Sequence, residues 1–229
     1  MMGRSKLLRQ MGVGALAGTA AALPFTVPRL PAIAFFTPDR ALLGHRLLLL
    51  AAVGGWVLFG LYWEAAAKNA SAAIRSESRA SRGLHVFLVN AALLLEIAPI
   101  RGLGRWASVS VTLMLAGLAI EAGGLFLAFW ARRHLGRNWS GEISIKLDHE
   151  LIRAGPYRLL RHPIYTGLLA MYFGVALVTG EWLGTVGLAL AVIAYCRKLR
   201  LEETNLGKAF GSDYEGYRRR TWALVPGIY

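Results

Sequence analysis

Long apolar runs alternate along the chain with short segments that are rich in polar, basic and turn-forming residues. A helix needs ~20 mostly apolar residues to cross the hydrocarbon core of a bilayer. On this criterion the sequence predicts about six membrane spans. Their predicted bounds are residues 11–36, 41–63, 84–100, 106–130, 164–179 and 182–196. We therefore expect an all-α, polytopic transmembrane helical protein.

The first apolar run, residues 11–36, has two interpretations. It contains three prolines between positions 24 and 31, so a straight helix cannot continue through it. Basic residues precede an apolar stretch that ends in small residues near positions 20–22, which is also the pattern of a secretory signal peptide. The sequence leaves a broken span and a signal peptide both open.

The last two predicted spans are joined by only Thr179, Gly180 and Glu181. A connection this short predicts a tight antiparallel helical hairpin. Because a hairpin returns the chain to the surface that it left, its two outer ends meet at one face of the membrane. We expect this return to bring His162 close to Glu203.

Composition and charge agree with a membrane protein of fixed orientation. The chain is 55% hydrophobic, yet it carries a formal net charge of +13. With the N-terminus inside, the six-span interpretation places 21 of the 26 Lys and Arg residues on the inner side, as positively charged inner loops require. We expect a multi-pass protein among membrane lipids, with both termini cytoplasmic. The basic residues interrupt apolar runs and do not form one solvated face, so no nucleic-acid partner is expected.

Other common classes of site have no support in the sequence. A single cysteine, Cys196, permits neither an internal disulfide nor a thiolate zinc cluster, and no HxxxH or HxxH pair is present, so we expect no metal. No GxGxxG motif follows a predicted strand, which excludes a Rossmann cofactor domain. Glycines within the spans, including Gly117, Gly123 and Gly124, predict close helix packing.

Two polar segments flank the predicted hairpin. The first, residues 149–167, contains a Gly155–Pro156 turn, followed by Pro163 at a position suited to the first turn of a helix. The second contains adjacent glutamates, Glu202 and Glu203, which point in different directions on a helix. One is expected to pair with Lys198 or Arg200 on its own helix, which leaves the other for a ligand. A belt of arginines and tyrosines at the membrane interface is the alternative interpretation.

In order and spacing, these segments resemble the isoprenylcysteine carboxyl methyltransferase family, a group that includes phospholipid methyltransferases. The resemblance covers residues 134–229. It is carried by His149, Gly155, Pro156, Tyr157, Arg161, His162, Pro163, Tyr165, Gly167, Glu202, Glu203, Leu206, Phe210, Gly211, Tyr214 and Tyr217. The chain departs from the family between Tyr217 and Val225, where a basic stretch precedes the Val-Pro pair.

The resemblance implies a membrane methyltransferase that depends on S-adenosylmethionine. Residues 1–130 would be N-terminal transmembrane helices, and residues 131–229 a catalytic region with the hairpin and a cytoplasmic cofactor-binding tail. The implied cofactor site is lined by His149, Gly155, Tyr157, Arg161, His162, Tyr165, Glu202 and Glu203, and Arg200 is the candidate catalytic residue. Cationic donors, carboxylates and aromatic rings suit the charged, polar and ring portions of this cofactor.

The acceptor is expected to be lipophilic: an isoprenylcysteine-like carboxylate on a lipid-anchored substrate, a lipid or a small hydrophobic molecule. Two other functions stay open. One is an NADPH-dependent lipid or sterol reductase, a family of similar architecture with a related Arg-His-Pro element. The other is a membrane protein without enzymatic activity, such as a transporter or an assembly factor, for which the broken run 11–36 and the mid-span Glu121 are the main support. Glu121 is alternatively a neutral acid bonded to another helix, and Glu96 is expected at the interface.

Overall fold

The computed structural model describes residues 40–68, 73–97, 104, 109–139, 144–146 and 150–228. Five long helices form most of this structure. They are α4 (Arg40–Ala67), α5 (Arg79–Ile97), α6 (Val111–Leu135), α7 (Pro163–Thr179) and α8 (Trp182–Phe210). The shorter elements are the 3₁₀ helices η1 (Gly136–Asn138) and η2 (Gly155–Arg158), helix α9 (Ser212–Arg218), and strands β1 (Ala73–Ser76) and β2 (Ser144–Lys146). The two strands pair as a small antiparallel ribbon, which the sequence did not predict.

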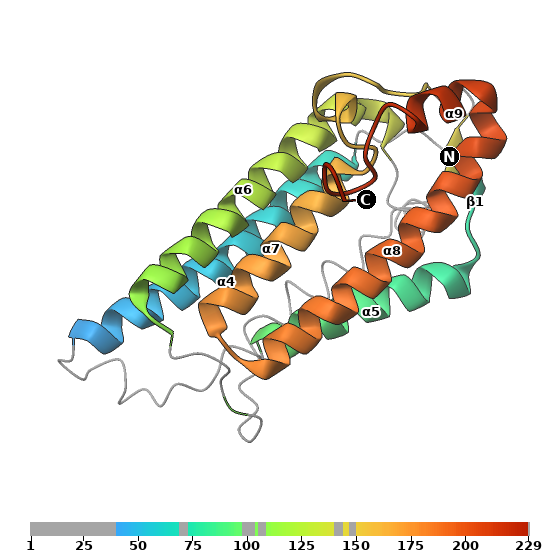
Figure 1. Cartoon of the computed structure of the whole chain (residues 1–229). Helices are drawn as coiled ribbons and strands as arrows, with labels where there is room; N and C mark the ends of the chain where they lie inside the picture. The colour runs from blue at the N-terminus through green and yellow to red at the C-terminus, as the bar shows by residue number, and fades with distance from the viewer. Residues whose placement is uncertain are drawn as a thin grey trace.

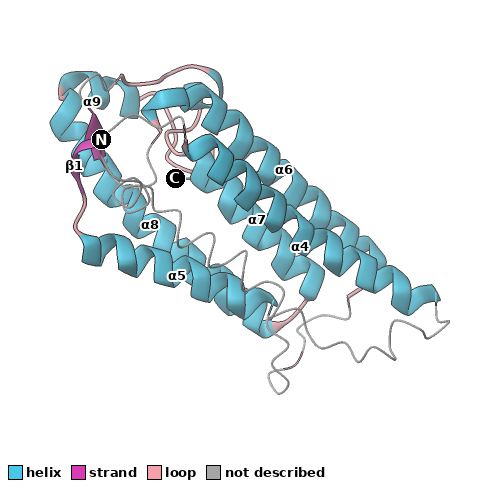
Figure 2. Cartoon of the chain, turned by 180° about the vertical axis from the view of Figure 1, so that it is seen from behind, coloured by secondary structure: helices cyan, strands magenta, loops and turns pink. Residues whose placement is uncertain are grey.

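The long helices form two groups. Helices α4, α6 and α7 lie side by side, and α5 runs along α8 (Figure 1; Figure 2 shows the same grouping from behind). Helix α7 also contacts α5 and α8, and the turn from α7 into α8 joins the two groups covalently. From that turn, α7 and α8 diverge toward the opposite end of the molecule, where α9 and the C-terminal tail lie (Figure 1).

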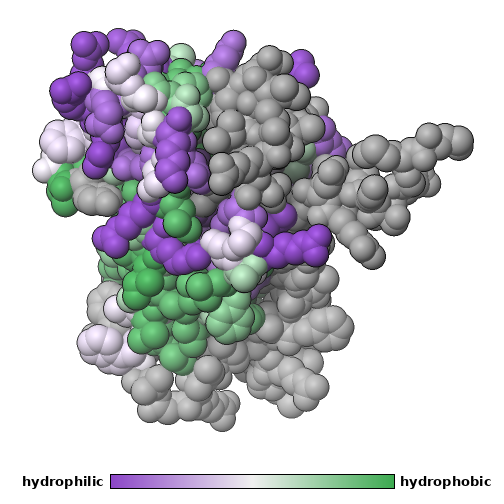
Figure 3. All heavy atoms as spheres, turned by 90° about the vertical axis from the view of Figure 1, so that its right-hand side faces the viewer, coloured by the Kyte–Doolittle hydropathy of each residue, from purple (hydrophilic) through white to green (hydrophobic). Residues whose placement is uncertain are grey.

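Four of the helical segments are long and apolar enough to cross a membrane: Leu43–Ala67, Arg79–Ile97, Val111–Asn138 and Trp182–Phe210. Helix α7 is a shorter apolar helix. Large apolar side chains such as Leu61, Phe87 and Phe126 are exposed on the outside of the bundle, as lipid-facing residues would be. Figure 3 shows hydrophobic residues gathered below a hydrophilic end on one face of the molecule. The predicted all-α, polytopic class is confirmed.

Five of the six predicted spans coincide with helices, and residues 11–36 lie outside the described part of the chain. The predicted bounds were less accurate. Helix α6 begins at Val111 and not at residue 106, because the Ser110 side chain accepts a hydrogen bond from the Leu113 N–H and caps the helix there. Helix α8 continues well beyond residue 196, since apolar composition marks only the part of a helix that faces lipid.

Two glycine pairs bring the backbones of α6 and α7 into contact. A Cβ atom added to Gly117 would lie 2.6 Å from the Gly174 carbonyl oxygen, and one added to Gly167 would lie 2.5 Å from that of Gly124. The sequence-based packing role is therefore confirmed for Gly117 and Gly124. It is wrong for Gly123, where an added Cβ would meet no atom of the described residues within 4 Å.

The hairpin turn has the predicted form. Helix α7 ends at Thr179, and Gly180 adopts a left-handed conformation with φ of 60° while its N–H donates to the Ala176 carbonyl at 2.9 Å. Helix α8 then begins at Trp182. A glycine is favoured at this position because its positive φ strains other residues.

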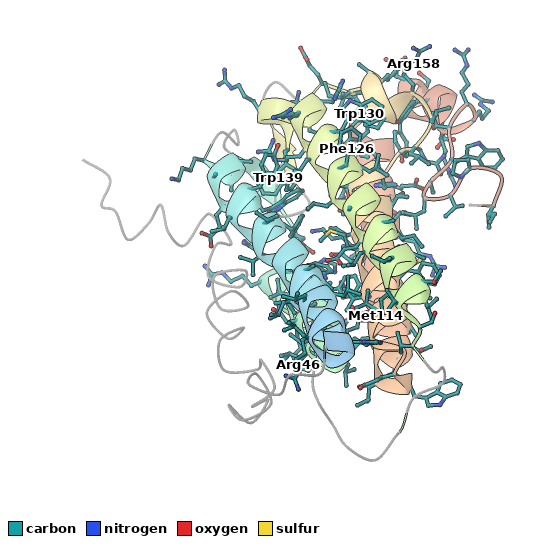
Figure 4. All side chains as sticks on the ribbon, turned by 90° about the vertical axis from the view of Figure 1, so that its left-hand side faces the viewer. Arg46, Met114, Phe126, Trp130, Trp139 and Arg158 are labelled. Carbon is teal, nitrogen blue, oxygen red and sulfur yellow. The ribbon has the colours of Figure 1, made fainter. Side chains whose placement is uncertain are left out.

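A buried arginine joins α4 and α6 at the end of the bundle that carries α9. The Arg132 guanidinium donates to the carbonyl of Gly136 at 2.7 Å and also to that of Ala66, and it lies 4.5 Å from the centre of the Trp139 ring. Arg46 and Arg158 mark the two opposite ends of the bundle (Figure 4). The end near Arg158 holds the polar segments that flank the hairpin.

Candidate functional site

The candidate site forms where the chain before α7 meets the last turns of α8 and the C-terminal tail. Backbone hydrogen bonds hold this meeting: Arg161 N–H donates to Trp222 at 2.8 Å, and His162 N–H donates to Ala223 at 3.1 Å. In return, Trp222 N–H donates to the Leu159 carbonyl at 2.9 Å. The tail is thus fixed against the segment before α7, and the side chains of residues 161 and 162 contact α8.

Arg161 is the centre of the cluster. Its Nε donates to Glu203 Oε1 at 2.7 Å, and both side chains are largely buried. Its Nη1 donates to the carbonyls of Arg218, at 3.1 Å, and of Thr221. Charge-assisted hydrogen bonds of this kind are about twice as strong as neutral ones. The Arg161 guanidinium therefore links the segment before α7 to α8 and to the tail.

His162 and Tyr165 reach the same pair of glutamates. His162 Nε2 lies 3.3 Å from Glu203 Oε1, and the Tyr165 hydroxyl donates to Glu202 Oε2 at 2.6 Å. The two rings stack with their centres 5.4 Å apart. The predicted approach of His162 and Glu203 is therefore found. Both carboxylates are engaged across the hairpin, so the expectation that one has no protein contact is wrong, although the Glu202 side chain stays 33% exposed.

Three tyrosines support the cluster from the loop and α9. The Tyr217 hydroxyl donates to the Tyr157 carbonyl at 2.8 Å, and burial raises the pKa of Tyr217 to about 12. Burial likewise raises the pKa of Tyr157 and of Tyr214 well above the ordinary value, so all three are neutral donors at physiological pH. The buried Tyr214 hydroxyl faces Glu203 without a hydrogen bond of standard geometry among the described residues.

Arg218 is a site residue that the sequence reasoning did not select. Its side chain is 53% exposed, and its guanidinium lies 3.9 Å from Glu203 and 3.8 Å from Glu215. Exposed ion pairs of this length contribute roughly 0 to 1 kcal/mol, so this cation can reorient at little cost. The signal available in the sequence was its position directly after Tyr217, in the basic stretch where the chain departs from the family.

The other residues selected from the sequence do not all lie in the described part of the chain. His149 lies outside the described residues. Tyr157 is buried behind the cluster, and Gly155 has a φ of 59° with its Cα against the His134 ring, which a Cβ would strike. Both positions therefore support the loop. Arg200 is exposed on α8, two residues before Glu202 and so roughly on the opposite side of the helix.

No group of three or more His, Cys, Asp or Glu side chains in the described part of the chain is placed to hold a metal ion. The chemistry of the cluster is instead that of a mixed ionic site. It combines two guanidinium groups, two carboxylates, an imidazole and phenol rings at one end of a transmembrane hairpin. Such a set suits a ligand that itself carries both charges and rings.

The fold and the cluster define a polytopic helical membrane protein with a polar site at the open end of its C-terminal hairpin. Comparisons with known proteins identify the class. The family model for phospholipid methyltransferases matches residues 112–213. The chain is 28% identical over 106 residues to a protein-S-isoprenylcysteine O-methyltransferase of Schizosaccharomyces pombe, covering 45% of each chain. It is 34% identical over 127 residues to the cobalt-zinc-cadmium resistance protein CzcN of Cupriavidus metallidurans, covering 55% of each.

The matched regions span about half the length of these relatives. A solved structure of the eukaryotic intramembrane Ras methyltransferase, an isoprenylcysteine carboxyl methyltransferase, is similar with 15% identity and a TM-score of 0.48, covering 95% of this chain and 96% of that one. Residues 112–213 are thus similar to the phospholipid and isoprenylcysteine methyltransferases, in agreement with the resemblance found in the sequence. These matches do not favour the reductase alternative.

Proposed function

We propose that this protein is an integral membrane methyltransferase that transfers a methyl group from S-adenosylmethionine to a lipophilic acceptor. The observation that carries the proposal is the contact of Arg161 and His162 with Glu203 across the open end of the hairpin. These three residues lie within the segment that matches the methyltransferase family. The relatives that are named as methyltransferases support the same reaction class.

The residues of the cluster fit this cofactor. S-adenosylmethionine presents a carboxylate, an ammonium group, a sulfonium, ribose hydroxyls and an adenine ring. Arg218 offers a partly exposed guanidinium for the carboxylate, and Glu202 offers exposed carboxylate surface for the ammonium or the hydroxyls. The buried Tyr214 hydroxyl is a donor with unused capacity at the same place. These unfilled positions are what a polar ligand would complete.

Each residue then has a distinct task. Arg161 holds Glu203 in place and fixes the tail, so Glu203 is oriented before any ligand arrives. Tyr165 orients Glu202 in the same way, and the stacked ring pair with His162 forms an aromatic wall. When bound, S-adenosylmethionine supplies an electrophilic methyl group on its sulfonium sulfur. The protein contributes alignment of the acceptor and exclusion of water, which are the main requirements of a direct displacement.

The acceptor most compatible with this placement is lipophilic and enters from the bilayer. The apolar residues Leu159 and Trp222 are exposed beside the cluster, and apolar side chains cover the outer faces of the helices. An amphiphile whose chain stays in lipid would present its polar end at this level. A carboxylate on an isoprenylated cysteine, a lipid head group and a small hydrophobic molecule all satisfy this description.

The topology belongs to the same proposal. Among the described basic residues that were predicted on the inner side, Arg82, Arg132 and Arg197 lie at the end of the bundle that holds the site. Arg46 lies at the other end (Figure 4). The excess of positive charge supports a cytoplasmic site with cytoplasmic termini. In this proposal residues 131–229 form the catalytic region, and residues 1–130 contribute the remaining helices.

Equilibrium binding to the detergent-purified protein tests the cofactor. We expect S-adenosylhomocysteine to bind in the micromolar range, about −8 kcal/mol at 1 μM, and NADPH not to bind measurably. Glu203→Gln removes a charged partner and should weaken binding about 10-fold to 100-fold, equivalent to ~1.5 to 3 kcal/mol. The matched control is Glu64→Gln on α4, which should leave binding unchanged. Preferential binding of NADPH would favour a reductase. Unchanged binding of S-adenosylhomocysteine in Glu203→Gln would indicate that the cluster only contacts lipid head groups at the membrane interface.

Arg200 is the proposed catalytic residue, and its exposure separates it from the cofactor cluster. We expect Arg200→Ala to lower methyl transfer to a lipophilic test acceptor, such as a farnesylated cysteine analogue, without changing the affinity for S-adenosylhomocysteine. Transfer is measured as incorporation of labelled methyl groups at saturating donor. An unchanged transfer rate would remove Arg200 from the catalytic set while leaving the cofactor site intact.

A further inference from the structure

Two glutamates lie in the interior of the helical bundle with carboxyl oxygens that are unpaired among the described residues. Glu96 of α5 is 1% exposed and Glu121 of α6 is 2% exposed. Both carboxyl oxygens of Glu96, and Oε1 of Glu121, make no hydrogen bond with the described residues. The sequence had placed Glu96 at the membrane interface near a span end, and the structure shows that its side chain is covered by the bundle. Buried carboxyl groups within a membrane are costly, and an unpaired one calls for a functional explanation.

Glycines on three neighbouring helices make room for these side chains. A Cβ atom added to Gly55 of α4 would strike the Glu121 carboxyl, and one added to Gly174 of α7 would lie 2.8 Å from Glu121 Cβ. On α8, a Cβ added to Gly187 would lie 2.9 Å from Glu96 Cγ. The carboxyl side chains therefore fill the space that the glycines provide. Such tight packing fits a very small ligand and opposes a hydrated cation or a lipid head group.

Few other titratable groups lie near the two carboxyls in the described part of the chain. Glu96 and Glu121 are close enough to interact electrostatically, and Tyr172 of α7 is the further titratable group within range of Glu96. The Tyr172 hydroxyl already donates to the Val89 carbonyl at 2.9 Å. The ion pairs within the described residues include no basic partner for either glutamate. Two uncompensated carboxylates in a low-dielectric interior repel each other strongly.

A second unpartnered polar group lies beside this pair. Trp56, the residue after Gly55 on α4, is 9% exposed, and its indole Nε1 has no hydrogen-bond partner among the described residues. Its ring packs edge-on against Tyr172, with the ring centres 4.7 Å apart. An unused donor and unused acceptors thus gather in one apolar region, contributed by helices of both groups.

We propose that Glu96 and Glu121 form an intramembrane proton-binding site that links the α5–α8 pair to the α4–α6–α7 group. A proton is the one cation that fits the packed space and removes the repulsion. The site lies away from the cofactor cluster: Gly174 is 11 residues along α7 from Pro163, or ~16 Å at 1.5 Å per residue. This inference does not depend on the proposed methyltransferase activity.

The position of the pair gives proton binding a consequence for the rest of the molecule. Glu96 belongs to one helix group and Glu121 to the other, and the cofactor cluster is divided in the same way. Its Arg161 and His162 precede α7, whereas Glu203 is on α8. Loss of the proton would drive the two groups apart at a junction that they share. Proton binding therefore stabilises the arrangement in which the two halves of the cluster meet.

Infrared spectroscopy of the purified protein tests the proposal directly, because it requires no reagent to reach the site. The wild type at neutral pH should show a carboxylic acid C=O stretching band that persists when exposed carboxyls are fully ionised. The band should be lost in the double variant Glu96→Gln/Glu121→Gln and retained in Glu150→Gln, which changes an exposed glutamate. Identical spectra for the double variant and the wild type in this region would overturn the proposal.

A second measurement keeps the proposal testable if the double variant is unstable. A proton bound more tightly in the folded state stabilises the fold at low pH, and this stabilisation is lost as the pH rises and the folded pair ionises. The unfolding temperature of the wild type should therefore fall on going from neutral to alkaline pH, and each single Gln variant should show a smaller fall. Equal falls in wild type and single variants would refute proton binding. Failure to bind S-adenosylhomocysteine would refute only the proposed cofactor.

Discussion

Replacing Gly124 by alanine should destabilise the protein, whereas the same change at the adjacent Gly123 should not. Both glycines lie within α6, but only Gly124 faces α7. A Cβ at Gly124 would strike the Gly167 carbonyl and would lie 3.0 Å from both Ala170 Cβ and Met171 N. Backbone atoms make up most of this contact, so the two helices must separate. At Gly123 the space is open.

The size of the difference follows from these contacts. Inserting a methyl group into a packed interior typically costs about 1 to 3 kcal/mol, and a contact with backbone favours the upper part of that range. Alanine in place of glycine in an unhindered helix gains about 0.5 to 1 kcal/mol, because it reduces the freedom of the unfolded chain. This gain applies at both positions and cancels in the difference, so Gly124→Ala should be less stable than Gly123→Ala by about 1 to 3 kcal/mol.

Denaturant-induced unfolding of both variants in the same detergent, followed by tryptophan fluorescence, measures this difference. Binding of S-adenosylhomocysteine is the second readout, because α7 positions the residues before it that form the cluster. Gly124→Ala should bind more weakly than Gly123→Ala. Equal unfolding free energies for the two variants would show that the α6–α7 contact is not as close as the structure indicates.

Two further predictions concern the tail and the topology. Tyr217→Phe removes the buried hydrogen bond to the Tyr157 carbonyl, so the free energy of unfolding should fall by about 1 kcal/mol. Thermal unfolding measures this loss, and an unchanged midpoint would contradict the stabilising role of this hydrogen bond. Glu181 lies in the turn at the far end from the cluster, so in a Cys196→Ala background Glu181→Cys should react with a membrane-impermeant thiol reagent added outside the cell. Reaction from the cytoplasmic side alone would reverse the proposed orientation.

The hairpin and the approach of its ends were predictable because they depend on local features. Three residues between two apolar runs permit only a tight return, and the return fixes which residues of the two arms lie at the same level. His162 and Glu203 could therefore be paired without a structure. Gly180 adopts the positive φ that closes this turn.

The contacts of the tail and the burial of the glutamates were not predictable in the same way. Arg161 donates to carbonyls of Arg218 and Thr221, and no pattern of side chains indicates which backbone carbonyls will face a guanidinium. Glu96 appeared interfacial because it lies near the end of an apolar run. Its burial arises because α8 packs beside that end of α5, and linear hydropathy does not report which neighbour covers a residue.

The glycine contacts between α6 and α7 have a consequence for how the protein can be divided or recombined. The sequence-based boundary at residue 130 falls inside α6, which ends at Leu135, whereas the family match begins at residue 112, at the start of this helix. Helix α6 therefore lies in the same matched segment as the hairpin. A chimera that exchanges the helices before residue 109 between relatives keeps this contact intact, and it is the natural way to ask whether those helices select the acceptor.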